Sequence, residues 1–233
     1  MRKFLFSTCL AGTLAAFAGP YALAAEPVVL APVPAIDAPL AKTHGTATAI
    51  LSGGCFWGMQ DVFQHVKGVK EALSGYTGGT ANTAHYQMVS TGTTGQAESL
   101  EITYDPSVVT YGTLLRVFVS VAANPTELDY QGPDHGTQYR SMIWVESPEQ
   151  RRIAAAYLNQ LAAAHTFDGT IATKVATAMP FYPAEAYHQN FAVLHPGYPY
   201  IALIDAPKVT ALASLFPTLY RASPSQVRVA SNG

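Results

Sequence analysis

Hydrophobic and polar positions divide the first half of the chain into alternating strands and helices. Residues 47–52 form a short apolar run that predicts a buried strand, and residues 69–76 predict a second strand. Between these strands the apolar side chains recur at helical spacing, at Met59, Val62, Phe63 and Val66. Residues 98–104 alternate between apolar and polar side chains, which is typical of a strand with one buried face.

The second half of the chain continues this order of elements. Residues 111–122 carry one apolar helical face, and residues 138–145 predict the next strand. The sequence Ser-Pro-Glu-Gln at 147–150 has the form of a capping box with proline at the first helical position, so we expect a helix to begin there. A further strand is predicted over residues 172–178 and a short helix near residues 209–216.

Two successive β-α-β units followed by a further helix and strand favour an α/β fold (α+β class). We predict a ferredoxin-like split β-α-β sandwich with an additional C-terminal helix and strand. A doubly wound parallel sheet is the alternative. It is disfavoured because Gly53-Gly54-Cys55, which follows the first strand, has neither of the glycine spacings of phosphate-binding loops.

Residues 1–24 have the features of a secretory signal peptide. Two basic residues precede an uncharged apolar run over residues 4–17, and residues 22–24 match an A-x-A cleavage site. An uncleaved membrane anchor is the alternative, but the run is shorter than the roughly 20 residues of a membrane span, and Pro20 interrupts it. We therefore expect cleavage at or just after Ala24. The mature protein would be periplasmic or secreted, with no stable membrane association.

The rest of the chain divides into three segments. Residues 25–43 are rich in proline and alanine and lack periodicity, so we predict an extended, mobile linker. Residues 44–220 contain every predicted strand and helix, and we expect them to form one catalytic domain. Residues 221–233 are predicted to be a polar tail.

Composition excludes several classes of function. Apolar residues make up 49% of the chain and charged residues 12%, which excludes an intrinsically disordered protein. The net charge of −2, without basic runs, argues against a nucleic-acid partner. The chain has two cysteines, and Cys9 would leave with the signal peptide. Cys55 would then be a single thiol in an oxidising compartment, which is an unusual arrangement.

Cys55 is placed where a predicted strand passes through two glycines into a helix. The N-terminus of a helix favours a thiolate by roughly 0.3–1 kcal/mol, so we expect this thiol to be nucleophilic. Phe56 and Trp57 follow it and could form an apolar pocket for a methyl group or a thioether. The alternative is that Cys55 is a small buried apolar residue and that the two aromatic residues belong to the core.

Glu98 is the candidate acid. By strand alternation its side chain shares the apolar face of residues 100, 102 and 104, and burial would raise the pKa of its carboxyl. A carboxyl that stays protonated near pH 7 can act as a general acid. The alternative is that Glu98 precedes the strand and is solvated. Tyr86 and Tyr139 are candidate phenol donors.

Five sequence blocks, taken in order, resemble the A-type peptide-methionine sulfoxide reductases. They are Gly-Cys-Phe-Trp-Gly at 54–58, Gly-Tyr-Thr-Gly-Gly at 75–79, Thr-Gly-Gln-Ala-Glu at 94–98, Asp-His-Gly-Thr-Gln-Tyr-Arg-Ser at 134–141 and Phe-Tyr-Pro-Ala-Glu at 181–185. The resemblance extends from about residue 47 to residue 203. It implies a ferredoxin-like core and reduction of methionine S-sulfoxide, free or in proteins, without a metal or bound cofactor.

The resemblance also implies roles for individual residues. Cys55 would be the nucleophile, and Glu98 would protonate the sulfoxide oxygen with the help of hydrogen bonds from Tyr86 and Tyr139. Phe56 and Trp57 would hold the methyl group of the substrate. Asp134 would support substrate binding or orientation through water.

The chain departs from the family pattern at several positions. Gln60 stands where glutamate is frequent, Gln96 where histidine is common, and Ala-Ala-Asn-Pro at 122–125 where His-Asp-Pro is frequent. These departures leave the tuning of the pKa values in the site open. The usual C-terminal resolving cysteines are also absent. We therefore expect an external thiol, from a thioredoxin, a glutaredoxin or a small molecule, to reduce the Cys55 sulfenic acid.

Two alternative functions remain at this point. A cysteine hydrolase would use Cys55 with His188 or His135 as its base. A non-catalytic module would use the aromatic pocket to recognise methionine.

Overall fold

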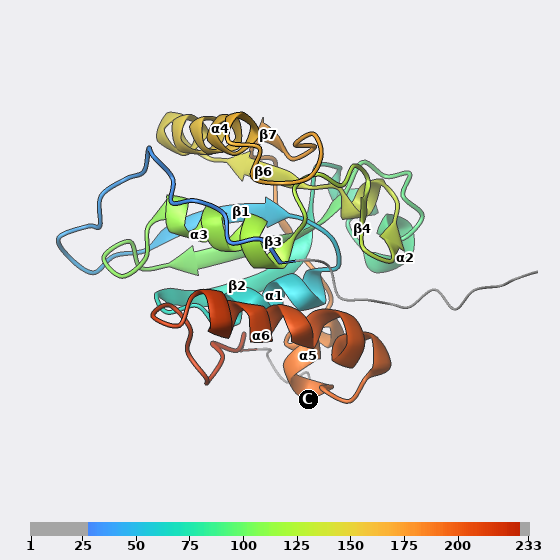
Figure 1. The fold of residues 1–233 in the computed structure, drawn as a ribbon. Coiled ribbons are helices and arrows are strands. Elements are labelled where there is room, and N and C mark those ends of the chain that lie inside the picture. The colour runs from blue at the N-terminus through green and yellow to red at the C-terminus, as the bar shows by residue number, and fades with distance from the viewer. Residues whose placement is uncertain (1–27, 229–233) are drawn as a thin grey trace, which may run out of the picture.

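A six-stranded mixed sheet lies at the centre of the described part of the chain, residues 28–228, in this computed structural model (Figure 1). The predicted signal peptide and the last five residues of the tail lie outside the described residues. The strands of the sheet, in chain order, are β1 Ala47–Ser52, β2 Val69–Thr77, β3 Ala97–Tyr104, β6 Met142–Val145, β7 Lys174–Thr177 and β8 Tyr182–Pro183. The two-residue strands β4 Tyr130–Gln131 and β5 Asp134–His135 form a separate hairpin.

The order of the strands across the sheet is β7-β6-β1-β3-β2-β8. Among the four central strands, β6, β1, β3 and β2, each strand runs antiparallel to its neighbours. The helical connections from β1 to β2 and from β3 to β6 each join strands that are not adjacent in the sheet. This is the split β-α-β arrangement, so the ferredoxin-like prediction is confirmed. β7 extends the sheet parallel to β6, and β8 pairs with the outer edge of β2.

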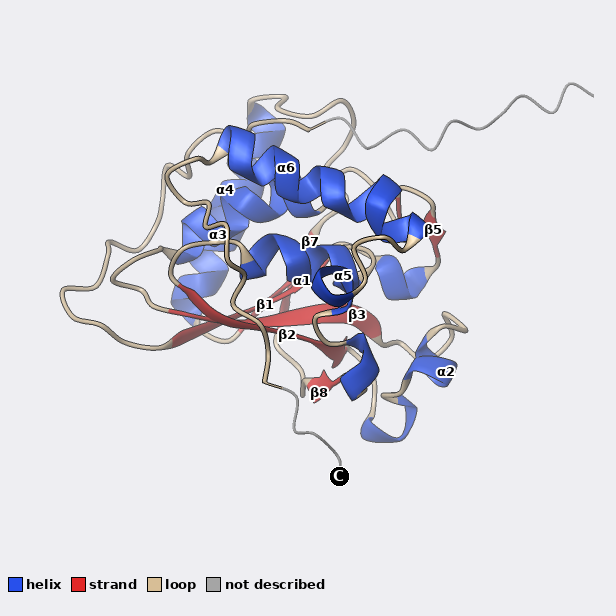
Figure 2. Cartoon of the chain, turned by 90° about the horizontal axis from the view of Figure 1, so that it is seen from below, coloured by secondary structure: helices blue, strands red, loops and turns tan. Residues whose placement is uncertain are grey.

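Helices cover one face of the sheet (Figure 2). They are α1 Phe56–Gln64, α3 Tyr111–Val117, α4 Pro148–Ala163 and α6 Ala206–Leu215, while α2 Tyr86–Val89 and α5 Phe191–Leu194 are single turns. The main core lies between this helical layer and the sheet, and its fully buried side chains include Leu51, Phe63, Leu100, Leu114 and Leu161. No helix in residues 28–228 has the length and apolar character that a membrane span needs.

Several boundaries differ from the predictions for identifiable reasons. The predicted strand at 138–145 starts at Met142, because Thr137–Tyr139 form a 3-10 turn instead. The guanidinium of Arg140 donates to the carbonyls of Gly95 and Gln96, which holds this turn beside the start of β3. The helix predicted over 111–122 ends in a π-helical turn, Phe118–Ala122. Ser147 is the N-cap of α4 as predicted, since the Gln150 N–H donates to Ser147 Oγ. The Gln150 side chain accepts from the Glu146 N–H, one residue before the position that a capping box requires.

Residues 28–43 were predicted to be a mobile linker, and they lack helices and strands as predicted, but they are bound along the helical layer. In Figure 1 this blue segment crosses α3. Ala31 is fully buried, and its N–H donates to Ser120 Oγ at 3.0 Å. Tyr157 Oη donates to the Pro32 carbonyl, and the Asp37 carboxylate accepts from Gly112 N–H, each at 2.8 Å. A segment without helix or strand has no regular backbone hydrogen bonds of its own, so its N–H and C=O groups can bond to its neighbours.

The described part of the predicted polar tail is also bound to the domain. The Arg221 and Ser225 N–H groups donate to carbonyls at the end of α1. Val227 N–H donates to Asn190 Oδ1, and Asn190 Nδ2 donates back to the Val227 carbonyl, both at 2.9 Å. Residues 221–228 therefore pack against α1 and the turn at Asn190.

Replacement of Asp37 with alanine tests the attachment of the segment at residues 28–43. Asp37 accepts from two groups in the first turn of α3, the Gly112 N–H and the Thr110 hydroxyl. Loss of this cap-like interaction should lower the free energy of unfolding by about 1 kcal/mol. Urea denaturation measures this change, and the exposed Asp168→Ala is the control. A variant as stable as the control would show that the attachment contributes nothing.

Candidate active site

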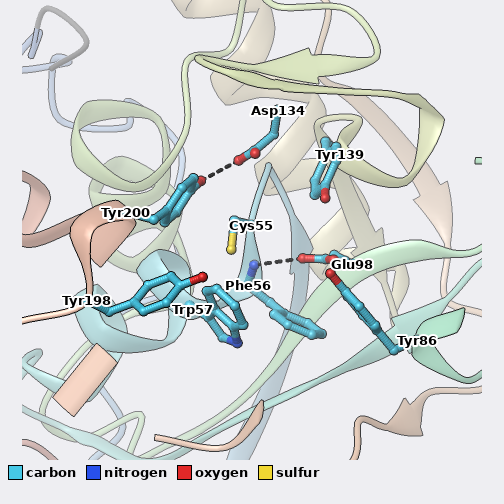
Figure 3. Close-up of a pocket in the computed structure, with 9 residues that line it drawn as sticks. All are labelled: Cys55, Phe56, Trp57, Tyr86, Glu98, Asp134, Tyr139, Tyr198 and Tyr200. Carbon is cyan, nitrogen blue, oxygen red and sulfur yellow. Dashed lines mark hydrogen bonds between the residues drawn. The ribbon is translucent and has the colours of Figure 1, made fainter. Parts of the chain in front are cut away.

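A cavity of about 220 Å³ opens where the start of α1 meets β3 and the segment before α6. Its lining, drawn in Figure 3, consists of Cys55, Phe56, Trp57, Tyr86, Glu98, Asp134, Tyr139, Tyr198 and Tyr200. All seven residues predicted from the sequence therefore lie in one pocket. Tyr198 and Tyr200 were missed, because they fall in a proline-interrupted segment without periodicity.

Cys55 is the residue that precedes the first turn of α1, as its position after two glycines predicted. Gly54 has a φ of +95°, and a Cβ there would lie 2.7 Å from the Gln131 side chain, so this backbone path needs glycine. Gly54 therefore permits the tight turn between β1 and α1.

The Cys55 thiol differs from the prediction in its protonation. Burial raises its pKa well above the ordinary value, and the nearby carboxyls of Glu98, Asp205 and Asp134 raise it further. The Trp57 N–H acts in the opposite direction. The effect of the α1 N-terminus, which lowers the thiol pKa, is therefore smaller than the opposing effects of burial and of the nearby carboxyls. The thiol is protonated in the substrate-free protein.

Glu98 is buried in β3, with 2% of its surface exposed, as strand alternation predicted. Phe56 N–H donates to its Oε2 at 3.0 Å. Burial raises the pKa of the carboxyl to about 8, and the Phe56 hydrogen bond only partly offsets this. At pH 7 roughly nine-tenths of the Glu98 carboxyls carry a proton.

Tyr86 and Tyr139 approach Glu98 from different loops. Tyr86 begins α2, where its N–H donates to Glu185 Oε1 at 2.9 Å, and Tyr139 ends the 3-10 turn after β5. In Figure 3 both phenol groups point toward the Glu98 carboxyl. Burial and the charges of the site raise the pKa of both phenols, so both are proton donors.

Asp134 lies on the opposite side of the pocket, in β5. The Tyr200 hydroxyl donates a short hydrogen bond to its Oδ2. Burial raises the pKa of Asp134, whereas this hydrogen bond and the Lys208 ammonium lower it. Tyr200 therefore orients the carboxyl group that the sequence assigned to substrate binding.

Phe56 and Trp57 form an aromatic wall. The Trp57 indole stacks on Phe191, with 3.9 Å between the ring centroids, and its Nε1–H donates to His188 Nδ1 at 3.1 Å. The Phe56 ring lies 4.9 Å from the His188 ring and 5.8 Å from that of Tyr76. Both side chains of the wall are therefore fixed by neighbours that do not enter the pocket.

The departures from the family pattern lie outside the pocket lining. Gln60 donates to the Ala72 carbonyl and to Gln189 Oε1, each at 2.9 Å. Gln96 accepts from the Gly79 N–H and donates to the Thr80 carbonyl. Both glutamines connect loops to the sheet, so their role is structural.

Neither histidine of the hydrolase alternative is placed as its base. The Nδ1 of His188 already accepts from Trp57, and burial lowers its pKa. His135 is exposed and stacks on Tyr130, with 5.3 Å between their rings.

The pocket combines a thiol, a protonated carboxyl and an aromatic wall. This combination suits protonation of a weakly basic oxygen on an apolar substrate, and it offers the thiol no imidazole.

Comparison with known proteins agrees with this chemistry. The family model described as peptide methionine sulfoxide reductase matches residues 47–217. Peptide methionine sulfoxide reductase MsrA 2 of Mesorhizobium japonicum is 58% identical over 188 residues, covering 81% of this chain and 96% of the relative. The protein of the same name from Synechocystis is 50% identical over 165 residues, which cover 71% of this chain and 77% of the relative.

Solved structures show the same likeness. Methionine sulfoxide reductase A of Corynebacterium diphtheriae superimposes with a TM-score of 0.55 at 33% identity, over 74% of this chain and 87% of that one. Reduced Mxr1 from Saccharomyces cerevisiae gives a TM-score of 0.61 at 28% identity, over 70% and 95%. By its sequence, its fold and the family model that it matches, the chain belongs to the peptide methionine sulfoxide reductase A family, whose members reduce methionine sulfoxide at the expense of a thiol.

Proposed function

We propose that this protein reduces methionine S-sulfoxide, free or in proteins, by a cycle that uses the single thiol of Cys55. The protonated Glu98 carboxyl in the same pocket as that thiol is the observation that carries this proposal. A sulfoxide oxygen is a poor leaving group until it is protonated. The acid must therefore hold a proton at neutral pH, which burial of Glu98 provides.

The reducing step follows from the positions of the side chains. The methyl group of the substrate lies against Phe56 and Trp57, and the sulfoxide oxygen faces Glu98. Glu98 donates its proton to this oxygen, and the Cys55 thiol gives its proton to the same oxygen as the Cys55 sulfur bonds to the substrate sulfur. The sulfur–oxygen bond breaks and the oxygen leaves as water. Water then attacks the Cys55 sulfur, the sulfur–sulfur bond breaks and methionine leaves. Cys55 is left as a sulfenic acid, and the proton released by the water returns to the Glu98 carboxylate.

The return step uses an external thiol. In residues 28–228 Cys55 is the only cysteine, and the sequence outside that range adds only Cys9. A thiol from a thioredoxin-like or glutaredoxin-like protein, or a small thiol, condenses with the sulfenic acid to give a mixed disulfide and water. A second thiol then releases Cys55 and leaves as the oxidised disulfide.

Export places this reaction outside the cytoplasm. The basic start, the apolar run and the A-x-A site support removal of residues 1–24, and Cys9 with them. The substrates would then be oxidised methionines of exported proteins. The mass of the mature protein from its native host measures the cleavage, and an intact N-terminus would contradict it.

Turnover of the separate sulfoxide diastereomers tests the reaction. With dithiothreitol as reductant, the S-sulfoxide should yield methionine, while the R-sulfoxide should yield none above background. Cys55→Ser should abolish the activity. Binding of the S-sulfoxide without turnover would instead support a recognition module.

Glu98→Gln tests the acid. Glutamine keeps the shape of the side chain but holds no transferable proton, so the rate of methionine formation should fall by about 100-fold or more.

For the unmodified protein the rate should be constant below about pH 8 and fall above it, because Glu98 then loses its proton. His188→Ala tests the hydrolase alternative, in which the histidine and not the glutamate variant would lose activity.

Trapping with dimedone tests the single-cysteine cycle. One turnover with S-sulfoxide and no reductant should release one methionine per chain and leave a dimedone-reactive sulfenic acid on Cys55, identified by mass spectrometry. In a parallel sample without dimedone, adding reduced thioredoxin or glutathione should restore the free thiol. An internal crosslink at Cys55 in place of the adduct would contradict the cycle.

A further inference from the structure

Asp205 is a buried carboxyl that the proposed reaction does not use. It ends the π-helical turn Ile201–Asp205, immediately before α6, and it is 0% exposed. In the described part of the chain its carboxyl oxygens have no hydrogen-bond partner apart from the Lys208 ammonium near Oδ1. Burying a carboxylate without hydrogen bonds is costly, so a position like this calls for an explanation.

Helix capping does not explain Asp205. Aspartate is a favoured residue at the position before a helix, where its side chain accepts from the backbone N–H groups of the first turn. Asp205 occupies this position in α6, yet its side chain makes no capping hydrogen bond. The carboxyl therefore does not satisfy the free N–H groups of its own helix.

The carboxyl instead lies against the first turn of α1. A Cβ on Gly58 would lie 2.0 Å from Asp205 Oδ1 and 2.5 Å from its Cγ. Gly58 is three residues after Cys55, so the missing side chain of this glycine makes the space in which the carboxyl lies. The contact brings a negative charge beneath the turn that carries the thiol.

In the described part of the chain, Lys208 is the cation that pairs with this carboxyl. Its Nζ lies 3.5 Å from Asp205 Oδ1, and its side chain is only 18% exposed. The other charged groups that act on Asp205 are Asp134 of β5 and Asp61 of α1, and both oppose its ionisation. Lys208 therefore stabilises the ionised form of Asp205 against burial and against two neighbouring carboxyls.

We propose that Asp205, held by Lys208 beneath the first turn of α1, is a positioning residue that keeps the Cys55 thiol protonated at rest. It acts through Cys55 and is not part of the pocket lining. The positive end of α1 favours the thiolate, whereas the Asp205 carboxylate, packed against the same turn, disfavours it.

Asp205 and Glu98 are charged in different pH ranges. Burial raises the pKa of Asp205 to about 6, while that of Glu98 is raised to about 8. Between these values Glu98 is neutral and Asp205 is ionised. At neutral pH the negative charge of Asp205 therefore disfavours ionisation of the thiol, whereas the Glu98 carboxyl is uncharged and has no such effect.

A protonated thiol reacts slowly with oxidants and disulfides, because the thiolate is the nucleophile. This protection has value for an exported protein whose single thiol has no second cysteine to shield it. That consequence rests on the proposed function, whereas the effect of Asp205 on the resting thiol does not.

The experiment measures the rate at which iodoacetamide modifies Cys55 in the purified, substrate-free protein, from about pH 6 to pH 10, with modification assigned by mass spectrometry. In Asp205→Asn the pH profile should move to lower pH. Because a thiol of lower pKa is also a weaker nucleophile, the rate at pH 7.5 should rise by only about threefold for every tenfold increase in the thiolate fraction. A profile that coincides with that of the unmodified protein would overturn the proposal.

Lys208→Met provides a second route if Asp205→Asn fails to fold. Without the ammonium, the buried Asp205 carboxyl should be protonated at neutral pH, so the profile should move in the same direction. The double variant should show no further change.

Glu149→Gln, which removes an exposed carboxylate on α4, is the control for net charge. A profile at higher pH in Lys208→Met would overturn the proposal. The assay needs no turnover, so its result is independent of whether the sulfoxide is reduced.

Discussion

The hydrogen bond from the Phe56 N–H to the Glu98 carboxyl is the interaction on which the site depends. It joins the first turn of α1 to the middle strand of the sheet, and so fixes the proton donor beside the thiol. A single neutral donor does not compensate the carboxyl for the loss of water, and the group therefore keeps its proton. Additional hydrogen bonds, or solvent access, would leave an ordinary carboxylate unable to act as an acid.

The rest of the fold serves this arrangement. The split β-α-β order places β3 between β1 and β2, so Glu98 lies in the interior of the sheet. The aromatic wall is held from behind by His188 and Phe191, and Tyr200 orients Asp134. Four carboxyl or thiol groups lie close together, and burial raises the pKa of each. At neutral pH the Cys55 thiol and the Glu98 carboxyl are therefore uncharged, which suits a reaction that begins with the transfer of a proton.

The sequence predicted the core of this site because local patterns carried it. Strand alternation placed Glu98 on the apolar face, and the two glycines before Cys55 predicted a strand-to-helix turn. Long-range packing was not visible in the same way. The raised pKa of Cys55 arises from burial and from nearby carboxyls, one of which, Asp205, is 150 residues away in the chain. Tyr198 and Tyr200 belong to an irregular segment, and the residues at 28–43 bind the helical layer through backbone groups that no pattern of side chains reveals.

Titration of the Glu98 carboxyl shows directly whether this group holds a proton at neutral pH. Carbon-13 NMR of the protein labelled at the glutamate carboxyls, with the Glu98→Gln spectrum used for assignment, follows this group alone. We predict a midpoint near pH 8 in the substrate-free protein. A midpoint near the ordinary value of 4.5 would mean that Glu98 is ionised at neutral pH, and the protein would then lack the acid that its chemistry requires.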